Sequence, residues 1–213
     1  MEMDEVVRRY KCMIDDSHQV SSQYETGKRI SPKFLKIGTK SILFGVHQFI
    51  LHPVFVLKAW YILYGRLNLI EFCAITTHDL GYFGLENMDG EEGERHPEIA
   101  ACWWDGGLLD HTSFSGQVAQ EIIGHSRFYA KKHNTELSKL FYADKLAVAL
   151  YPVWLYKLLG NLSGEIHEYI NNSKKGNHSV HIKNGSQTKW IIEVQARMAL
   201  MGLLGEKRDE HGS

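Results

Sequence analysis

The feature that most restricts the fold is a largely apolar stretch from residue 42 to residue 64. It has the length of a membrane span, but its interior carries His47, Gln48, His52, Pro53 and Lys58. Polar and charged groups of this kind cost free energy in hydrocarbon. We therefore interpret the stretch as helix buried within protein, and we expect no membrane partner.

Helical patterns separated by polar loops continue along the chain. Apolar residues recur at helical spacing, Pro marks helix starts and Gly marks helix ends. The predicted helices are 53–64, 68–79, one from His96-Pro97, 117–124, one from Glu136 and 190–204. The segment 84–95 reads as a polar loop, and a short hairpin is predicted around 178–185. This order of elements predicts an all-α fold.

Length, charge and cysteine content narrow the class of protein. With 213 residues and no low-complexity linker, the chain is expected to form a single domain, 1–213. Its 24 basic and 25 acidic residues nearly balance, so no nucleic-acid partner is expected. The odd number of cysteines favours reduced thiols, and residues 1–10 lack the apolar run of a signal peptide. Both observations predict a cytoplasmic protein.

Histidine lies at the boundary of several predicted helices. His52 and His96 each precede a proline, which places them at expected helix caps. His78-Asp79 and His125 lie near the ends of helices. Neutral imidazole nitrogens and carboxylate oxygens are the ligands that divalent cations require. These positions are therefore candidate metal ligands.

Asp144 follows Leu140 by four residues, on the apolar stripe of the helix that begins near Glu136. A charged carboxylate on a core-facing stripe costs several kcal/mol if it stays unpaired. A bound cation removes that cost, and so does a neighbouring arginine or lysine. The residues alone leave both partners open.

Three motifs share their order and local context with a known superfamily. They are His52-Pro-Val-Phe-Val-Leu-Lys-Ala, Ala74-Ile-Thr-Thr-His-Asp-Leu-Gly and Tyr142-Ala-Asp-Lys-Leu. Together they resemble the opening helix, the defining motif and the closing aspartate helix of the HD-domain superfamily of metal-dependent phosphohydrolases. The resemblance covers about 45–155. It implies an HD-domain-like helical bundle with peripheral N- and C-terminal additions.

The resemblance also implies a dinuclear metal centre. The ligands that match those of one ion in the superfamily are His52, His78, Asp79 and Asp144. His96 and His125 match the branch that binds a second ion, and in that branch the aspartate of the dyad bridges both ions. We therefore expect two divalent metal ions, with Fe, Mn, Co, Zn, Ni and Mg not distinguished.

The match has a more specific part and two departures. His125-Ser-Arg followed by Leu137-Ser-Lys-Leu-Phe-Tyr-Ala-Asp is similar in layout to HD-type symmetrical diadenosine tetraphosphatases. The family's motif usually continues with a lysine or an aspartate soon after its glycine, whereas Tyr82-Phe83-Gly84 follow Gly81 here. His47 competes for the role of first ligand, and His52 is preferred because a valine and an alanine follow it at the family's spacing.

The implied activity is hydrolysis of a small phosphate ester, such as a nucleotide, by water activated at the metal ions. The expected catalytic residues are Asp79, Lys145 and Arg127. The expected substrate-binding residues are Arg95, Arg127, Lys131, Lys132 and Lys145.

Two other functions fit the same ligands. Mixed-valent di-iron oxygenases of the superfamily have a similar six-ligand arrangement, and sequence spacing does not separate them from hydrolases. A regulatory protein with a structural metal site would show no turnover. The tail from Asn161 onward is left open between capping the site and self-association into a homo-oligomer.

Overall fold

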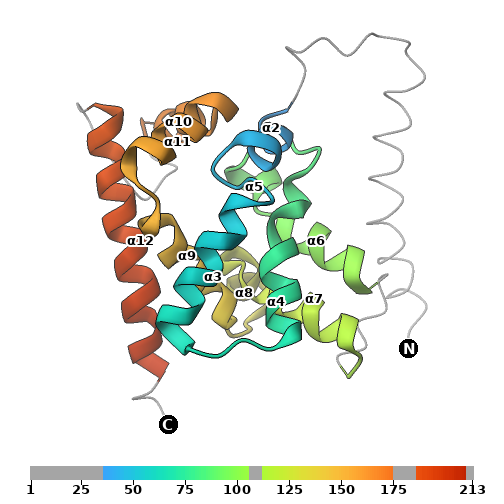
Figure 1. Ribbon diagram of the computed structural model, residues 1–213. Coiled ribbons are helices and arrows are strands. Elements are labelled where there is room, and N and C mark those ends of the chain that lie inside the picture. Colours follow the sequence, from blue (N-terminus) through green and yellow to red (C-terminus); the bar gives the residue numbers. More distant parts are fainter. Residues whose placement is uncertain (1–35, 106–111, 175–185, 210–213) are drawn as a thin grey trace, which may run out of the picture.

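The computed structural model describes residues 36–105, 112–174 and 186–209, and every regular element in these ranges is a helix (Figure 1). In chain order the elements are α2 Ile37–Phe44, α3 Leu51–Tyr64, α4 Leu69–Thr77, the 3-10 helix η2 His78–Tyr82, α5 Gly90–Gly93, α6 His96–Asp105, α7 Phe114–Gly124, α8 Arg127–His133, α9 Lys139–Leu150, α10 Val153–Ser163, α11 Glu165–Lys174 and α12 Gln187–Asp209. The prediction of an all-α fold is confirmed for the described part of the chain.

The main core lies where α3, α4, α6, α7 and α9 pack together. Helix α9 contacts α3, α4 and α7, and α6 lies along α7. Large, fully buried apolar side chains of this core include Trp60, Ile75, Ile122 and Leu140. Burial of an Ile or Leu side chain contributes about 1.5 to 3 kcal/mol. This packing fixes the helix ends that carry most of the candidate ligands.

A second buried cluster joins the C-terminal helices to the rest of the molecule. Its large aromatic members include Tyr151, Tyr156 and Trp190. Figure 1 shows α12 as a long helix along one side of the molecule, where it packs on α9 and also contacts α10. The C-terminal segment therefore packs against the helix that carries Asp144.

The apolar stretch 42–64 is not the continuous buried helix that the sequence predicts. Val56 and Trp60 are buried, but Ile50 and Ile62 are more than half exposed. Helix α2 ends at Phe44, and α3 begins at Leu51 after a turn. A Cβ atom at Gly45 would overlap Oε1 of Glu165, so only glycine fits where the turn passes α11. The break places His47 on the turn, outside both helices.

His52 and His96 lie inside their helices rather than at the caps. Helix α3 begins at Leu51, and α6 begins at His96 itself. Proline is tolerated in the first turn because the first N–H groups of a helix have no intrahelical partner. The prediction of a helix start at each His-Pro pair is confirmed, and the assignment of both histidines as caps is wrong by one or two positions.

Other boundaries also differ from the sequence prediction. Helix α7 starts three residues early because the Ser113 hydroxyl accepts a hydrogen bond from the backbone N–H of Gly116. The segment 84–95 contains the short helix α5, and α2, α8, α10 and α11 have no counterpart among the predicted helices. Helix α12 is longer than the predicted 190–204, and the hairpin predicted around 178–185 lies outside the described residues. Across the described ranges, no helix combines enough length with enough apolar character to cross a membrane.

Candidate metal centre

Five helices bring the six predicted metal ligands together in the interior. The ligands are His52 in the first turn of α3, His78 and Asp79 at the start of η2, His96 at the start of α6, His125 directly after α7 and Asp144 in the middle of α9. All six are buried, with exposed fractions from 0 to 8 %. Titratable side chains at this depth need compensating partners, because burial otherwise costs them several kcal/mol.

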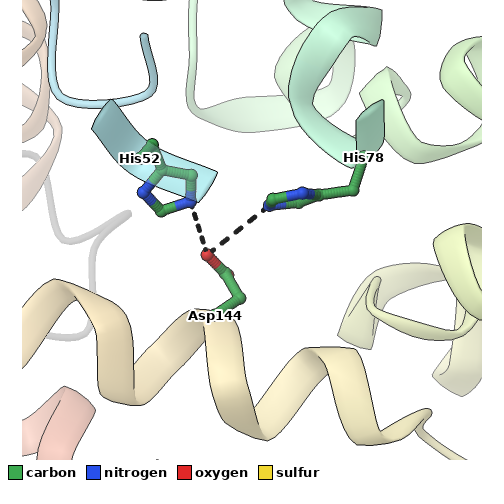
Figure 2. A group of neighbouring side chains, drawn as sticks. All are labelled: His52, His78 and Asp144. Carbon is green, nitrogen blue, oxygen red and sulfur yellow. Dashed lines mark hydrogen bonds and ion pairs between the residues drawn. The ribbon is translucent and has the colours of Figure 1, made fainter. Parts of the chain in front are cut away.

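The first group of donors consists of His52, His78 and Asp144 (Figure 2). Oδ1 of Asp144 lies 3.1 Å from Nε2 of His52 and 3.8 Å from Nε2 of His78. Figure 2 shows both imidazole rings pointing at this one oxygen from separate helices. The three donor atoms therefore surround a common point.

Asp79 connects this group to a second one. Its Oδ2 atom lies 3.2 Å from Nε2 of His52 and 3.3 Å from Nε2 of His78. Its Oδ1 atom lies 3.7 Å from Nε2 of His96. One oxygen of the carboxylate thus faces His52 and His78 and the other faces His96, which is an arrangement that suits a bridging ligand.

The second group contains Asp79, His96 and His125. Nε2 of His96 lies 3.1 Å from Nε2 of His125. Donor atoms of His125 and Asp79 also lie within 4.8 Å of one another and of His78, so His78 borders both groups. The described residues therefore place donor atoms for one metal ion, and further donor atoms of the same cluster could hold a second.

The imidazole rings are oriented by hydrogen bonds from their other nitrogen. In three of them Nδ1 bonds to the backbone carbonyl three positions earlier, as in His78 to Ile75, His96 to Gly93 and His125 to Ile122. Such bonds fix the tautomer and leave the Nε2 lone pair for a metal ion. Nδ1 of His52 lies 3.5 Å from the Tyr151 hydroxyl, which itself donates to the carbonyl of Val46.

Two buried polar atoms at the centre lack a hydrogen bond. They are Nε2 of His78 and Oδ2 of Asp79. An orphaned buried acceptor costs about 1 to 3 kcal/mol, more if it is charged. A cation relieves this cost, and ligand bonds of about 2.1 Å at angles of about 90 to 109° separate neighbouring donors by about 3.0 to 3.4 Å. Most of the measured separations lie in or close to that range, so the residues present fit a divalent metal ion.

The protonation state of most of these residues at pH 7 also favours metal binding. Burial lowers the pKa of His52, and burial together with a neighbouring imidazole lowers that of His96. For His125 burial and nearby His78 lower the pKa to about 4. These rings are neutral at pH 7, which is the form that binds metals. Since Nδ1 donates in His96 and in His125, two lone pairs face each other across 3.1 Å until a cation lies between them.

The two carboxylates and His78 behave differently. Burial acts to raise the pKa of Asp79, but the imidazoles of His78 and His52 hold it below its usual value. For Asp144 the same burial is outweighed by Lys145 and by the hydrogen bond with His52, so its pKa is also lowered. The two carboxylates in turn outweigh burial at His78 and raise its pKa, so a metal ion would replace a proton there.

Lys145 supplies the second partner that the sequence left open for Asp144. Its Nζ atom donates to Oδ2 of Asp144 at 2.7 Å, while Oδ1 faces the histidines. The basic side chain is therefore observed on one oxygen, and the other oxygen lies among donor atoms that could hold a metal ion. Lys145 keeps 27 % of its side chain exposed, and its ammonium group lies at the edge of the ligand cluster through Asp144.

The other predicted substrate-binding residues are exposed, and no hydrogen bond or ion pair among the described residues joins them to the cluster. Arg127 follows His125 by two residues and contacts Sδ of Met201 at 3.8 Å. Arg95 precedes His96 on the surface. Lys131 and Lys132 lie in the last turn of α8, where positive charge complements the helix dipole. Their roles stay predictions.

Contacts with His96 explain the unusual Gly81-Tyr82 sequence after the dyad. A Cβ atom at Gly81 would overlap the carbonyl oxygen of His96, so glycine lets η2 approach α6. The Tyr82 ring stacks on His96 with 3.7 Å between centroids. An aromatic ring thus lies where the related motif carries a charged side chain.

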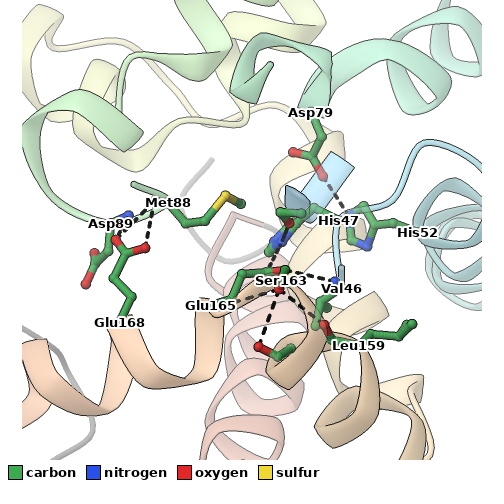
Figure 3. A network of polar contacts seen from close by, with 12 residues as sticks. Val46, His47, His52, Asp79, Met88, Asp89, Leu159, Ser163, Glu165 and Glu168 are labelled. Atoms are coloured by element: carbon green, nitrogen blue, oxygen red, sulfur yellow. Dashed lines mark hydrogen bonds and ion pairs between the residues drawn. The ribbon is translucent and has the colours of Figure 1, made fainter. Parts of the chain in front are cut away.

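His47, the alternative first ligand, has a different partner that the sequence did not reveal. Its Nδ1 atom lies 2.8 Å from Oε2 of Glu165, a carboxylate with no exposed surface (Figure 3). The two residues are separated by 118 positions, and no local pattern links them. His52 rather than His47 therefore faces Asp79 and Asp144.

Comparisons of the chain with protein-family models, with curated proteins and with solved structures give no match. The helical fold and the buried His/Asp cluster are compatible with the HD-like arrangement that the motifs suggest. The described residues place histidine and aspartate side chains in position to bind a metal ion, and the donor set extends to a second.

Proposed function

We propose that this protein is a metal-dependent phosphohydrolase of the HD type that acts on a nucleotide or another small phosphate ester. The observation that carries the proposal is the position of Asp79. One of its oxygens faces His52 and His78, and the other faces His96. A carboxylate shared in this way between two donor groups can bridge the two metal ions of a hydrolytic site.

The donor set divides into a group of four ligands for one ion and a group of three for the other, with Asp79 in both. His52, His78, Asp79 and Asp144 would hold one ion. Asp79, His96 and His125 would hold the other, and three protein ligands leave positions for water and substrate. Bound divalent cations lower the pKa of a coordinated water and polarise a phosphoryl oxygen.

The charge of the loaded site favours an anion. The four imidazoles are neutral when they ligate, so two ionised carboxylates oppose the charge of two divalent ions and leave a positive excess. Lys145 adds an ammonium group at the border of the cluster, held in place by Asp144. In the proposal Lys145 binds a phosphate oxygen, and Arg127 reaches the substrate from the exposed start of α8.

The experiment combines elemental analysis with a substrate screen. Purified protein is expected to contain a divalent metal and to hydrolyse at least one nucleotide, dinucleotide or phosphomonoester under Mn, Co, Mg or Fe. Asp79→Ala is expected to lose both metal and turnover, while Glu136→Ala, which removes an exposed carboxylate on the surface, keeps both. Alanine variants of His96 and His125 are expected to lose one equivalent of metal and to keep the other.

Each negative outcome has a distinct meaning. Wild-type protein that binds no metal, or an Asp79→Ala variant that binds it unchanged, contradicts the metal centre. Metal-loaded protein that consumes oxygen and hydrolyses no ester is an oxygenase. Metal-loaded protein that does neither has a regulatory role.

A further inference from the structure

The His47–Glu165 pair lies beside the ligand cluster but supplies none of its donors. Glu165 is the first residue of α11, in the C-terminal segment whose role the sequence left open. Its Oε1 atom accepts hydrogen bonds from the backbone N–H of Val46 at 2.9 Å and from the Ser163 hydroxyl at 2.7 Å. Its Oε2 atom lies 2.8 Å from Nδ1 of His47. The carboxylate is fully buried and held at both oxygens, so it is a fixed anion that orients the imidazole.

The His47 ring also lies close to residues of the cluster. Its centroid lies 5.2 Å from that of His52 and 5.6 Å from that of Tyr82, which in turn stacks on His96. His52 belongs to the first donor group and His96 to the second. Figure 3 shows His47 between the Glu165 carboxylate and Asp79. The ring therefore borders the metal centre on a side where both donor groups are near.

Nε2, the second ring nitrogen of His47, makes no hydrogen bond to another described residue. Among the described residues only Nδ1 of this ring has a polar partner, in Glu165 and, at 3.3 Å, in Ser41. The side chain keeps 15 % of its surface exposed, and Nε2 is not among the buried atoms that lack a partner. A ring anchored through Nδ1 and open at Nε2 has one hydrogen-bonding group to offer to a ligand at the centre.

We propose that His47, positioned by Glu165 and carrying a proton on both ring nitrogens, donates a hydrogen bond from Nε2–H to a phosphate oxygen of the substrate that the metal ions leave free. This rests on the proposed phosphohydrolase function and adds a residue of the turn 45–50 and one of α11 to its substrate site. It also gives the C-terminal segment a part in that site, because α11 supplies the anion that sets the ring. Glu165 is a positioning residue, and His47 is the group that touches the substrate.

The test is the binding of inorganic phosphate to the metal-loaded, full-length protein, measured by isothermal titration calorimetry. His47→Asn keeps a polar group near the Nδ1 position, where it can still reach Glu165, and removes Nε2. A hydrogen bond to a charged group contributes about 1.5 to 3 kcal/mol, so phosphate affinity is expected to fall about 10- to 100-fold. Metal content is expected to stay close to wild type, whereas the melting temperature is expected to fall because the buried ion pair with Glu165 is lost. His167→Asn, on an exposed histidine of α11, is the matched control and is expected to bind phosphate normally.

The outcomes separate this inference from the function on which it rests. Unchanged phosphate affinity in His47→Asn overturns the inference and leaves the phosphohydrolase proposal intact. Loss of metal from His47→Asn also overturns it, since the pair would then support the ligands rather than the substrate. Wild-type protein that holds no metal or, when loaded, binds no phosphate contradicts the proposed function, and the inference is overturned with it. If His47→Asn does not fold, Glu165→Gln decides by the same measurements, with a weaker fall in affinity expected.

Discussion

The His47–Glu165 ion pair predicts a pH dependence of stability that can be measured on metal-free protein. Burial acts to lower the pKa of His47, but the carboxylate of Glu165 outweighs it and raises the pKa from 6.5 to about 9. The protonated imidazole is thus preferred in the folded state. The stabilisation is fully present below pH 6.5 and is lost as the pH rises through 9.

The size of the effect follows from the two pKa values. A rise from 6.5 to about 9 corresponds to about 3 kcal/mol of stabilisation by the protonated form. Both groups are buried, with 15 and 0 % of their side chains exposed, so solvent screens the pair little. Of the total, about 2 kcal/mol should disappear between pH 7 and pH 9.

The assay is urea unfolding of wild type and Glu165→Gln at pH 7, 8 and 9, with a chelator present. The chelator is needed because a bound cation would repel the imidazolium. Groups that titrate alike in both proteins cancel in the difference between their free energies of unfolding. Wild type is expected to lose about 2 kcal/mol relative to the variant across this range. A constant difference, or one that grows in favour of wild type, would refute the assignment of an ion pair.

Further predictions concern packing and metal affinity. Gly81→Ala is expected to displace the backbone of His96 and so to release one equivalent of metal while the other stays bound. Elemental analysis would measure this, and two retained equivalents would contradict it. Leu140→Ala, at a fully buried site, is expected to lower the free energy of unfolding by about 3 kcal/mol, whereas Leu158→Ala, at a half-exposed site, changes it by less than about 1; equal losses would contradict the packing. Because His78 has a raised pKa and must release a proton on ligation, metal affinity measured by chelator competition is expected to rise from pH 6 to pH 8, and a flat profile would argue against His78 as a ligand.

The positions of the ligands could be predicted because they lie at local landmarks. Proline after His52 and His96 marks helix starts, and the dyad directly follows α4, two residues before Gly81. Asp144 stands out as a carboxylate on an apolar stripe. The structure brings these side chains into one buried cluster, as the motifs imply.

Other features depend on contacts between distant parts of the chain. The partner of His47 is 118 residues away, so no spacing rule could distinguish its role from that of His52. The break after Phe44 follows from the close approach of Gly45 to Glu165, which apolar content does not reveal. Helix α10 was not among the predicted helices, and large apolar residues such as Trp154 lie exposed on it.

Anomalous diffraction from crystals grown with Mn or Fe tests the central claim most directly. The account predicts two anomalous peaks about 3.5 to 4 Å apart, with the Asp79 carboxylate between them. One peak should lie beside Asp144 and the other between His96 and His125. A single peak beside Asp144 would reduce the site to one metal ion. The absence of any peak within the six-residue cluster, in protein that is folded and exposed to metal, would contradict the account.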